Sequence, residues 1–340
     1  MQALFAEPLS VRPLAPADLS QVVAIDSANE GRSRRGYVQQ RLKAALRDPA
    51  LHAQFAAVDA QGLAGHILAR VLEGEFGRRE RGLRLEMVGV RPDAHHHGVG
   101  RRLFEALVQW AAGHAIHELR TQAAWSDHGL LRWLHDMGFV LAPNTVVDCA
   151  VAGSTYLPER DDAIALPVGD GPGHEISFGT ASGNDFERLE RDSAVVRSMT
   201  PADLRDIVRI DRAGTGSDRA GYLKAKLAEA LEDSGVRVSL IAHRGAAALG
   251  FLMARVDHGD FGRTEPVAII DTLGVDPEAV RHGIGRALLS QLFSNLGALH
   301  VERVETVVET RDLALLGFLF ACGFAPSQRL PFVRRLNAAP

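Results

Sequence analysis

The sequence is poor in cysteine, in long apolar runs and in excess charge of either sign. Its 340 residues include only two cysteines, Cys149 and Cys322, which excludes a disulfide framework and predicts two small buried thiols. No apolar stretch is long enough to span a bilayer, and the first residues lack the basic and apolar segments of a signal peptide. The net charge of −4 leaves no basic surplus for nucleic acid. These absences predict a cytoplasmic protein without nucleic-acid or membrane partners.

The most informative feature that is present is a long internal repeat. Gly89-Val90-Arg91-Pro92 returns as Gly274-Val275-Asp276-Pro277, and Gly138-Phe139 returns as Gly323-Phe324. Both pairs are separated by the same 185 residues (275 − 90 and 323 − 138), and this register holds without a gap from about residue 11 to residue 145. Solenoid repeats are far shorter, so we expect two copies of a whole domain, at residues 1–151 and 192–340.

Each copy predicts the same mixture of helices and strands. Hydrophobic spacing indicates a strand, two helices, three strands, a helix after a glycine-rich loop, a strand, a helix and a last strand. Residues 152–191 lie between the copies and are rich in glycine and proline, which is typical of a linker, with one short strand expected at 175–178.

The glycine-rich loops have the composition of a phosphate-binding device. They lie at residues 95–101 and 280–286, between a strand and a helix. Glycines permit a tight turn, successive N–H groups can point at one anion, and the helix N-terminus adds positive potential. The loops lack both the P-loop lysine and the third glycine of the dinucleotide fingerprint. The residues expected at the anion are His95, His96, His97, Gly98, Val99, Gly100 and Arg101 in the first copy and Arg281, His282, Gly283, Ile284, Gly285 and Arg286 in the second.

The strand ending in Val-x-Pro, the Gly-x-Gly-Arg-x-Leu pattern after it and the later Gly-Phe pair resemble the GCN5-related N-acetyltransferase (GNAT) superfamily. The resemblance covers both copies almost completely. It implies an α/β protein of two tandem GNAT domains, each a mixed, twisted β-sheet flanked by α-helices. It also implies that acetyl-CoA binds where two central parallel strands splay apart, and that the acetyl group moves directly to an amine. The family's first loop position, Arg or Gln, is His95 in one copy and Val280 in the other, with Arg281 next.

The strand before each loop carries the next expectations. A glycine in a strand marks a bulge or a close approach, and Gly89 and Gly274 occupy this strand. The family's strand is bulged, and one of its backbone N–H groups polarises the thioester carbonyl. By position, the resemblance assigns this donor to Val88 and Leu273, and it places Val90 and Val275 beside the cofactor as well.

Glu86 and Asp271 are equivalent acids in the same apolar strand. An amine is protonated at neutral pH and must lose a proton before it attacks, and a nearby carboxylate can take that proton. Polyamine-acetylating members of the superfamily carry a glutamate at the matching place, so the resemblance implies that Glu86 and Asp271 are catalytic bases. Ion pairs with Arg70 and Arg255 would equally explain why an acid is buried here, and both interpretations stay open at this point.

The family's usual general acid is missing. That tyrosine lies four residues before the Gly-Phe pair, where this chain has Leu134 and Leu319. The thiolate would therefore leave unassisted, or be protonated by water or another residue. This departure keeps a non-catalytic acyl-CoA-binding role open for one or both copies. If only one copy is active, we expect it to be the second, because the Val-Asp-Pro sequence before its glycine-rich loop is the more usual one in the family.

The expected acceptor is the primary amine of a small molecule, with a protein lysine as the alternative. The acids Glu73, Glu75, Asp257 and Asp260 flank the hairpins before the loop strands, where they would attract a cationic acceptor or simply be solvated. Three consecutive loop histidines rarely converge on one ion, so we expect no metal site at residues 95–97.

Overall fold

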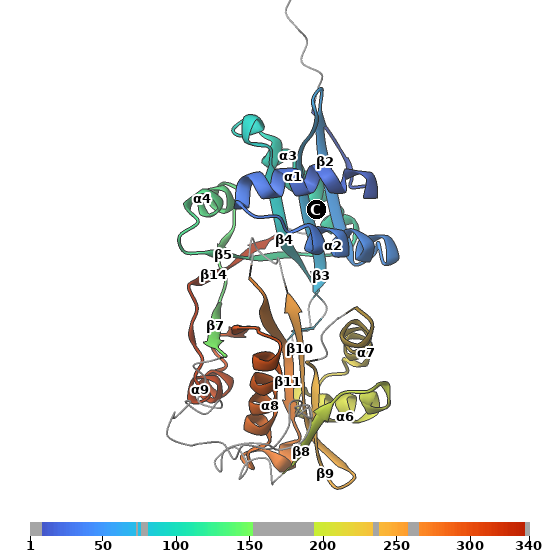
Figure 1. Cartoon of the computed structure of the whole chain (residues 1–340), viewed down its shortest axis with the longest axis vertical. Coiled ribbons are helices and arrows are strands. Elements are labelled where there is room, and N and C mark those ends of the chain that lie inside the picture. Colours follow the sequence, from blue (N-terminus) through green and yellow to red (C-terminus); the bar gives the residue numbers. More distant parts are fainter. Residues whose placement is uncertain are drawn as a thin grey trace, which may run out of the picture.

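The computed structural model describes residues 9–72, 74–75, 81–151, 194–233, 238–257 and 265–336. Two seven-stranded sheets lie one above the other along the long axis of the molecule, each flanked by helices (Figure 1). The predicted α/β architecture of two tandem domains is confirmed. The predicted linker at 152–191, with its short strand, lies outside the described residues.

The elements follow the predicted order in both repeats. The first repeat contains β1 (Ser10–Pro13), α1 (Leu19–Glu30), α2 (Arg35–Arg47), β2 (His52–Asp59), β3 (Gly62–Leu72), β4 (Gly82–Val90), α3 (Val99–Gly113), β5 (Glu118–Ala124), α4 (His128–Asp136), β6 (Val140–Leu141) and β7 (Asn144–Ala150). The second contains β8 (Val195–Ser198), α6 (Leu204–Thr215), α7 (Ala220–Ala228), β9 (Leu240–Arg244), β10 (Ala247–Asp257), β11 (Val267–Val275), α8 (Ile284–Ala298), β12 (Arg303–Glu309), α9 (Leu313–Ala321), β13 (Ala325–Pro326) and β14 (Arg329–Arg335). A π-helical turn, Glu229–Asp233, extends α7.

The last long strand of each repeat lies in the sheet of the other repeat. The strand order is β1-β2-β3-β4-β5-β14-β6 in the first sheet and β13-β7-β12-β11-β10-β9-β8 in the second. β14 runs antiparallel to β5, and β7 runs antiparallel to β12 (Figure 1). The repeats in the sequence therefore do not coincide with the sheets, because each sheet is completed by a strand from the other repeat.

Because of this exchange, each hydrophobic core is packed in part by side chains from the other repeat. Val147 and Cys149 of β7 are buried in the core of the second domain, together with Cys322. Phe332 of β14 packs against the core of the first domain. Both cysteines are buried thiols, as expected from the sequence, and burial raises the pKa of the Cys149 thiol to about 11.

Helices cover both faces of each sheet. In the first domain α1 and α2 pack on one face through a cluster that includes Val22 and Val38, while α3 packs on the other through Leu103 and Leu107. In the second domain α6 and α7 pack on one face and α8 on the other. The amphipathic spacing of each helix thus determines which of its sides meets the sheet.

The two central parallel strands of each sheet separate soon after they begin. β4 and β5 pair only at Leu83 with Leu119 and at Arg84 with Arg120, although both strands continue. β11 and β12 pair over Val267–Ile269 and then separate in the same way. Each domain therefore has the gap between splayed strands that the family resemblance implies.

Asp203 fastens β8 to the start of α6 and gives a first prediction. Arg197 donates two hydrogen bonds to this carboxylate, at 2.8 and 2.7 Å, and the Thr200 backbone N–H donates a third at 2.7 Å. Burial raises the pKa of Asp203, but these bonds outweigh it and lower the pKa to about 2. Since the pKa is lower in the folded state, the stabilisation is complete above about pH 4 and is lost as the pH falls toward 2.

We expect Asp203→Asn to lower the free energy of unfolding by about 1–2 kcal/mol at pH 7, and by less at pH 3, in urea titrations. The control is Asp206→Asn, three residues further along the chain, because the Asp206 side chain is 43% exposed and pairs with Arg209 at 3.6 Å rather than with Arg197 or Thr200. A difference between wild type and D203N that stays constant from pH 7 to pH 3 would contradict the assignment.

Candidate active site

The two equivalent acids each occupy a β-bulge. The register between β3 and β4 shifts between Leu68 and Ala69, which leaves Glu86 as the extra residue of β4. The register between β10 and β11 shifts in the same way and leaves Asp271 as the extra residue of β11. A bulge re-aims the side chain of the inserted residue. Both side chains point into the protein and are buried.

Gly89 and Gly274 do not form these bulges. A Cβ atom on Gly89 would lie 2.5 Å from the His66 ring, and one on Gly274 would lie 2.5 Å from the Phe251 ring. Each glycine thus makes room for a buried ring on the neighbouring strand, and the close approach of a ligand that the sequence suggested here stays a prediction. Burial lowers the pKa of His66 to about 3, so its ring is neutral.

Both acids are ion-paired. In the first repeat Glu86 lies 2.8 Å from Arg70 Nε and 3.4 Å from Arg41 Nε. Arg70 and Arg255 are the partners that the sequence suggested as an alternative to catalysis, and these ion pairs are present in both repeats. The role of the two acids as bases stays a prediction.

In the second repeat Asp271 pairs with Arg255, and Lys226 Nζ lies 3.4 Å from its other oxygen. Lys226 is the repeat equivalent of Arg41, so the internal repeat extends to the cations around each acid. Burial raises the pKa of Asp271, but Arg255 and Lys226 outweigh burial and lower the pKa to about 2. Asp271 is therefore ionised at neutral pH.

A chain of ion pairs joins the two bulges across the domain boundary. Arg70 Nη1 lies 3.2 Å from Glu229, which in turn lies 3.0 Å from Lys226 Nζ. Lys226 also lies 3.5 Å from Glu75 of the first repeat. Burial raises the pKa of Glu229, but Lys226 and Arg70 lower it well below its usual value. Glu229 was not predicted, because its counterpart is Ala44 and the repeat gives no signal there.

Among the described residues, this network joins four cations and four acids. Buried charges are stable only when they are paired, so removal of one member leaves a costly unpaired partner. The four cations are Arg41, Arg70, Lys226 and Arg255, and the four acids are Glu75, Glu86, Glu229 and Asp271.

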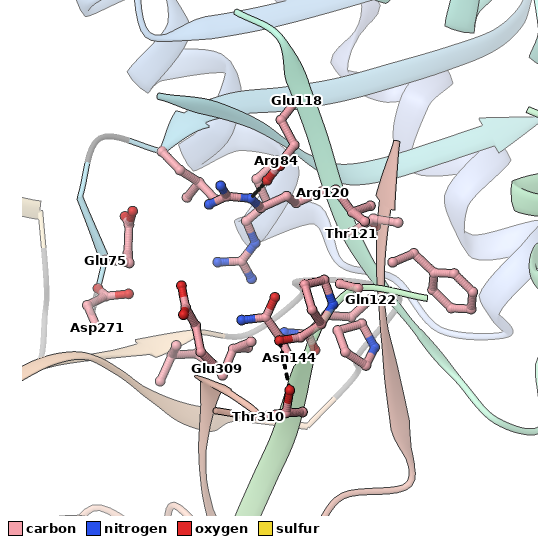
Figure 2. A pocket seen from close by; sticks show the side chains of 18 of the residues that line it. Glu75, Arg84, Glu118, Arg120, Thr121, Gln122, Asn144, Asp271, Glu309 and Thr310 are labelled. Atoms are coloured by element: carbon pink, nitrogen blue, oxygen red, sulfur yellow. Dashed lines mark hydrogen bonds and ion pairs between the residues drawn. The ribbon is translucent and has the colours of Figure 1, made fainter. Parts of the chain in front are cut away.

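A cavity of about 800 Å³ lies between the domains. Its lining includes Asp271 but not Glu86, so the two bulges differ in their access to this space. Figure 2 shows the acids Glu75, Asp271 and Glu309 on one side and the guanidinium groups of Arg84 and Arg120 on the other. Strand exchange contributes to the walls: the lining also includes Asn144 of β7 and Pro331, Phe332, Val333 and Arg335 of β14.

The sequence identified only part of this cavity. Glu75 was one of the hairpin acids expected near the acceptor, and it does line the cavity. Glu73, Asp260 and the Asp257 side chain are outside the part of the chain that the structure describes. Arg84 and Arg120 were not predicted, because nothing in the sequence shows which strand edges face the other domain.

The two glycine-rich loops share one backbone conformation. His96 and Gly98 have φ angles of 64° and 80°, and their equivalents Arg281 and Gly283 have 66° and 77°. Gly98 and Gly283 immediately precede α3 and α8, and neither helix start is capped by a side chain there. A Cβ atom on Gly98 would meet nothing within 4 Å. The first N–H groups of each helix are therefore open to an anion, as a phosphate-binding loop requires.

The second glycine of each loop permits close helix packing instead. A Cβ atom on Gly100 would lie 2.8 Å from Trp133 Nε1, and one on Gly285 would lie 2.9 Å from the Phe318 ring. Val99 and Ile284 are buried and anchor the loops in the two cores. The side chains left exposed at the loops are His95, His96, His97, Arg101, Arg281 and His282, while Arg286, Val88, Val90, Leu273 and Val275 are half-buried.

No cation-binding cluster accompanies the histidines. His95 Nε2 lies 2.9 Å from the carbonyl oxygen of Val90, which ties the loop to the strand before it. Within the described ranges, no group of three His, Cys, Asp or Glu side chains is arranged to hold a metal ion. Over the same ranges, no helix is both long enough and apolar enough to cross a membrane.

The leucines at the expected tyrosine positions belong to the cores. Leu134 and Leu319 are buried among apolar side chains and present no proton donor. Tyr222 on α7 has a buried hydroxyl that finds no hydrogen-bond partner among the described residues. Burial, with the charges of Glu75 and Asp271, raises the pKa of Tyr222 well above its usual value, so the hydroxyl keeps its proton.

Comparison with known proteins adds the family. A sequence model of the acetyltransferase (GNAT) family matches residues 20–139 and again residues 203–324. A search of curated protein sequences gives no significant match. A tandem GNAT protein from the clavulanic acid biosynthesis pathway is similar in structure, with a TM-score of 0.62 and 16% identity over 98% of this chain and 99% of its own. A GCN5-related N-acetyltransferase from Sphaerobacter thermophilus has a TM-score of 0.57 and 16% identity over 96% and 95% of the two chains.

A further similar structure is part of a longer enzyme. It is a fungal multi-domain GH3 β-N-acetylglucosaminidase with a GCN5-related glucosamine N-acetyltransferase region, with a TM-score of 0.64 and 12% identity. The match covers 98% of this chain but only 39% of the fungal chain. At these identities the structural likeness shows the fold alone.

Proposed function

Since the chain belongs to the GNAT acetyltransferase family, we propose that its second repeat transfers an acetyl group from acetyl-CoA to a primary amine held in the cavity between the domains. The observation that carries this proposal is the position of Asp271, which is at once the bulge residue of β11 and part of the cavity lining. A cavity of about 800 Å³ between two domains has the size of a small-molecule site, which favours a small amine over a lysine on the surface of another protein.

The loop geometry fits acetyl-CoA. The backbone N–H groups at residues 280–286 and 95–101 would hold its phosphates, because both loops have the same left-handed turns before a helix. β11 and β12 stop pairing after Ile269, two residues before Asp271. When bound, acetyl-CoA supplies an acetyl thioester, so that the new N–C bond forms as the C–S bond breaks and coenzyme A leaves as the thiol. The Leu273 backbone N–H remains our candidate donor to the carbonyl oxygen.

Asp271 acts on the acceptor. Its carboxylate accepts hydrogen bonds from the ammonium group and so orients the nitrogen. The same carboxylate takes the proton that the nitrogen must lose. Arg255 and Lys226 keep Asp271 ionised, but the same cations make it a weak base. The proton therefore passes on to water in the cavity rather than staying on the carboxylate.

The first repeat fits a different role. Its loop has the same backbone as the second loop, but Glu86 lies between Arg70 and Arg41 and outside the cavity lining. We propose that the first repeat binds acyl-CoA without catalysing transfer, and that it provides one wall of the acceptor cavity. This retains the non-catalytic alternative for one copy only.

Acetyl-CoA titration by calorimetry tests both assignments. We expect two sites in the wild type, loss of one site and of acetylation in Gly283→Glu, and loss of the other site with acetylation retained in Gly98→Glu. Glutamate adds bulk and negative charge where the phosphates would lie. Its backbone strain at positive φ costs about 1–2 kcal/mol, which the matched Gly283→Ala and Gly98→Ala variants share. If the wild type binds no acetyl-CoA, the proposed function is wrong.

A further inference from the structure

The cavity between the domains has a pair of arginines, Arg84 and Arg120, on one side and the acid Asp271 on another. On the basis of the proposed acetyltransferase function, we infer that its acceptor is a small amino acid-like molecule whose amine faces Asp271 and whose carboxylate, or equivalent anion, is bound by Arg84 and Arg120 of the other repeat. The first repeat would then select the substrate for the second.

The arginine end is unusual within the sheet. Arg84 and Arg120 are direct register partners on the parallel strands β4 and β5, and both guanidinium groups point into the cavity (Figure 2). Glu118 ion-pairs with Arg120, and the described lining near this pair also includes Arg335, the register partner of Glu118. A carboxylate between the Arg84 and Arg120 guanidinium groups would form strong charge-assisted hydrogen bonds.

The fold itself does not require this arginine pair. The equivalent positions in the second repeat are Ile269 and Glu305, which are also register partners and also lie in the splayed pair of strands. An apolar residue and an acid thus occupy the equivalent positions of the second sheet. The arginines are specific to the repeat whose strands face the other domain's bulge.

The acidic end lies on the opposite side of the cavity. Asp271 and Glu309 come from β11 and β12 of the second domain, and Glu75 joins them from the first (Figure 2). Glu309 pairs at 2.6 Å with Arg311, which also lines the cavity and whose side chain is 86% exposed. Exposed pairs contribute little, so Glu309 can also accept a hydrogen bond from an ammonium group.

Size and charge together define the substrate class. A volume of about 800 Å³ is in the range of small-molecule sites. A molecule with an amine at one end and a carboxylate at the other matches both walls. A diamine of the same length would bring a second positive charge to the two arginines and would be repelled.

Matched acceptors test the inference. Each series shares one chain length: γ-aminobutyrate, butylamine and putrescine with four carbons, and ε-aminocaproate, hexylamine and hexamethylenediamine with six. Release of coenzyme A thiol, corrected for hydrolysis, gives kcat/KM for each acceptor. In the better series we expect the wild type to prefer the amino acid over the alkylamine by on the order of 10- to 100-fold, and the diamine to be the poorest.

Two variants remove the anion site. Arg120→Gln and Arg84→Gln are expected to bring the ratio of kcat/KM for the amino acid to kcat/KM for the alkylamine close to one. Arg132→Gln is the control, because it removes the same charge from an exposed position on α4 that does not line the cavity. Thermal unfolding checks that each variant is folded, and Arg120 is the more exposed of the two cavity arginines.

The outcomes separate this inference from the proposed function. If alkylamines are acetylated with the same kcat/KM as amino acids, the inferred carboxylate site is wrong and the acetyltransferase function stands. If no acceptor is acetylated and acetyl-CoA does not bind, the proposed function is wrong. Calorimetry with ε-aminocaproate and γ-aminobutyrate then decides the inference alone: binding that is lost in Arg120→Gln supports the anion site, and the absence of binding overturns it.

Discussion

Replacing Asp271 by asparagine is expected to lower kcat by about 10²- to 10⁴-fold, the usual loss when the group that handles the transferred proton is removed. Asparagine keeps the shape of the side chain but carries no charge and cannot take up a proton. Acetyl-CoA binding should persist, because the loop at 280–286 is unchanged. Initial rates with a primary amine, together with calorimetric titration of acetyl-CoA, measure the two effects separately.

The first repeat provides a matched control for this change. Glu86→Gln removes the same charge from the equivalent bulge and takes one acid from Arg70 and Arg41, just as Asp271→Asn takes one acid from Arg255 and Lys226. Each variant is expected to lose about 3–5 kcal/mol of stability, because a buried ion-pair network loses one of its acids. Only D271N should lose turnover. Full turnover in D271N, or equal losses in both variants, would contradict the assignment of Asp271.

Deleting residues 328–340 is expected to unfold the sheet of the first repeat, although all of the deleted residues belong to the second. This segment contains β14, whose residues Arg329–Arg335 pair with all seven residues of β5. Its loss would leave one side of β5 without main-chain partners and would uncover the first core at Phe332. A domain of this size is stable by only about 5–15 kcal/mol, so we expect most of that stability to be lost.

Hydrogen–deuterium exchange distinguishes the two possible arrangements of β14. With the exchange of strands seen here, the amides of β5 (Glu118–Ala124) lose protection in the deletion variant. If β14 instead paired within its own repeat, protection would be lost in β12 (Arg303–Glu309). A milder change, Val333→Asp, places an unpaired charge at a buried position of β14 and should have the same signature. Val195→Asp, at an exposed position of β8, is its control.

The sequence predicted the features that neighbouring residues encode. The 185-residue offset identified two copies of one domain, and hydrophobic spacing placed its helices and strands. The glycine-rich loops were also predictable, because glycine readily adopts the left-handed conformation that such a turn before a helix needs. Both loops have this conformation at Gly98 and Gly283. Glu86 and Asp271 were identified because an acid in an apolar strand needs a local reason.

The tertiary structure decided what depends on residues far apart in the chain. β7 and β14 are equivalent strands, so no local pattern can tell whether each pairs within its own repeat or with the other. The bulges depend on the register with β3 and β10 rather than on the nearby glycines. The cavity, with Arg84 and Asp271 in one space, exists only because two domains meet. Long-range pairing and domain contacts bring these charges together, and for that reason the sequence alone determined the fold and the glycine-rich loops but not the cavity between the domains.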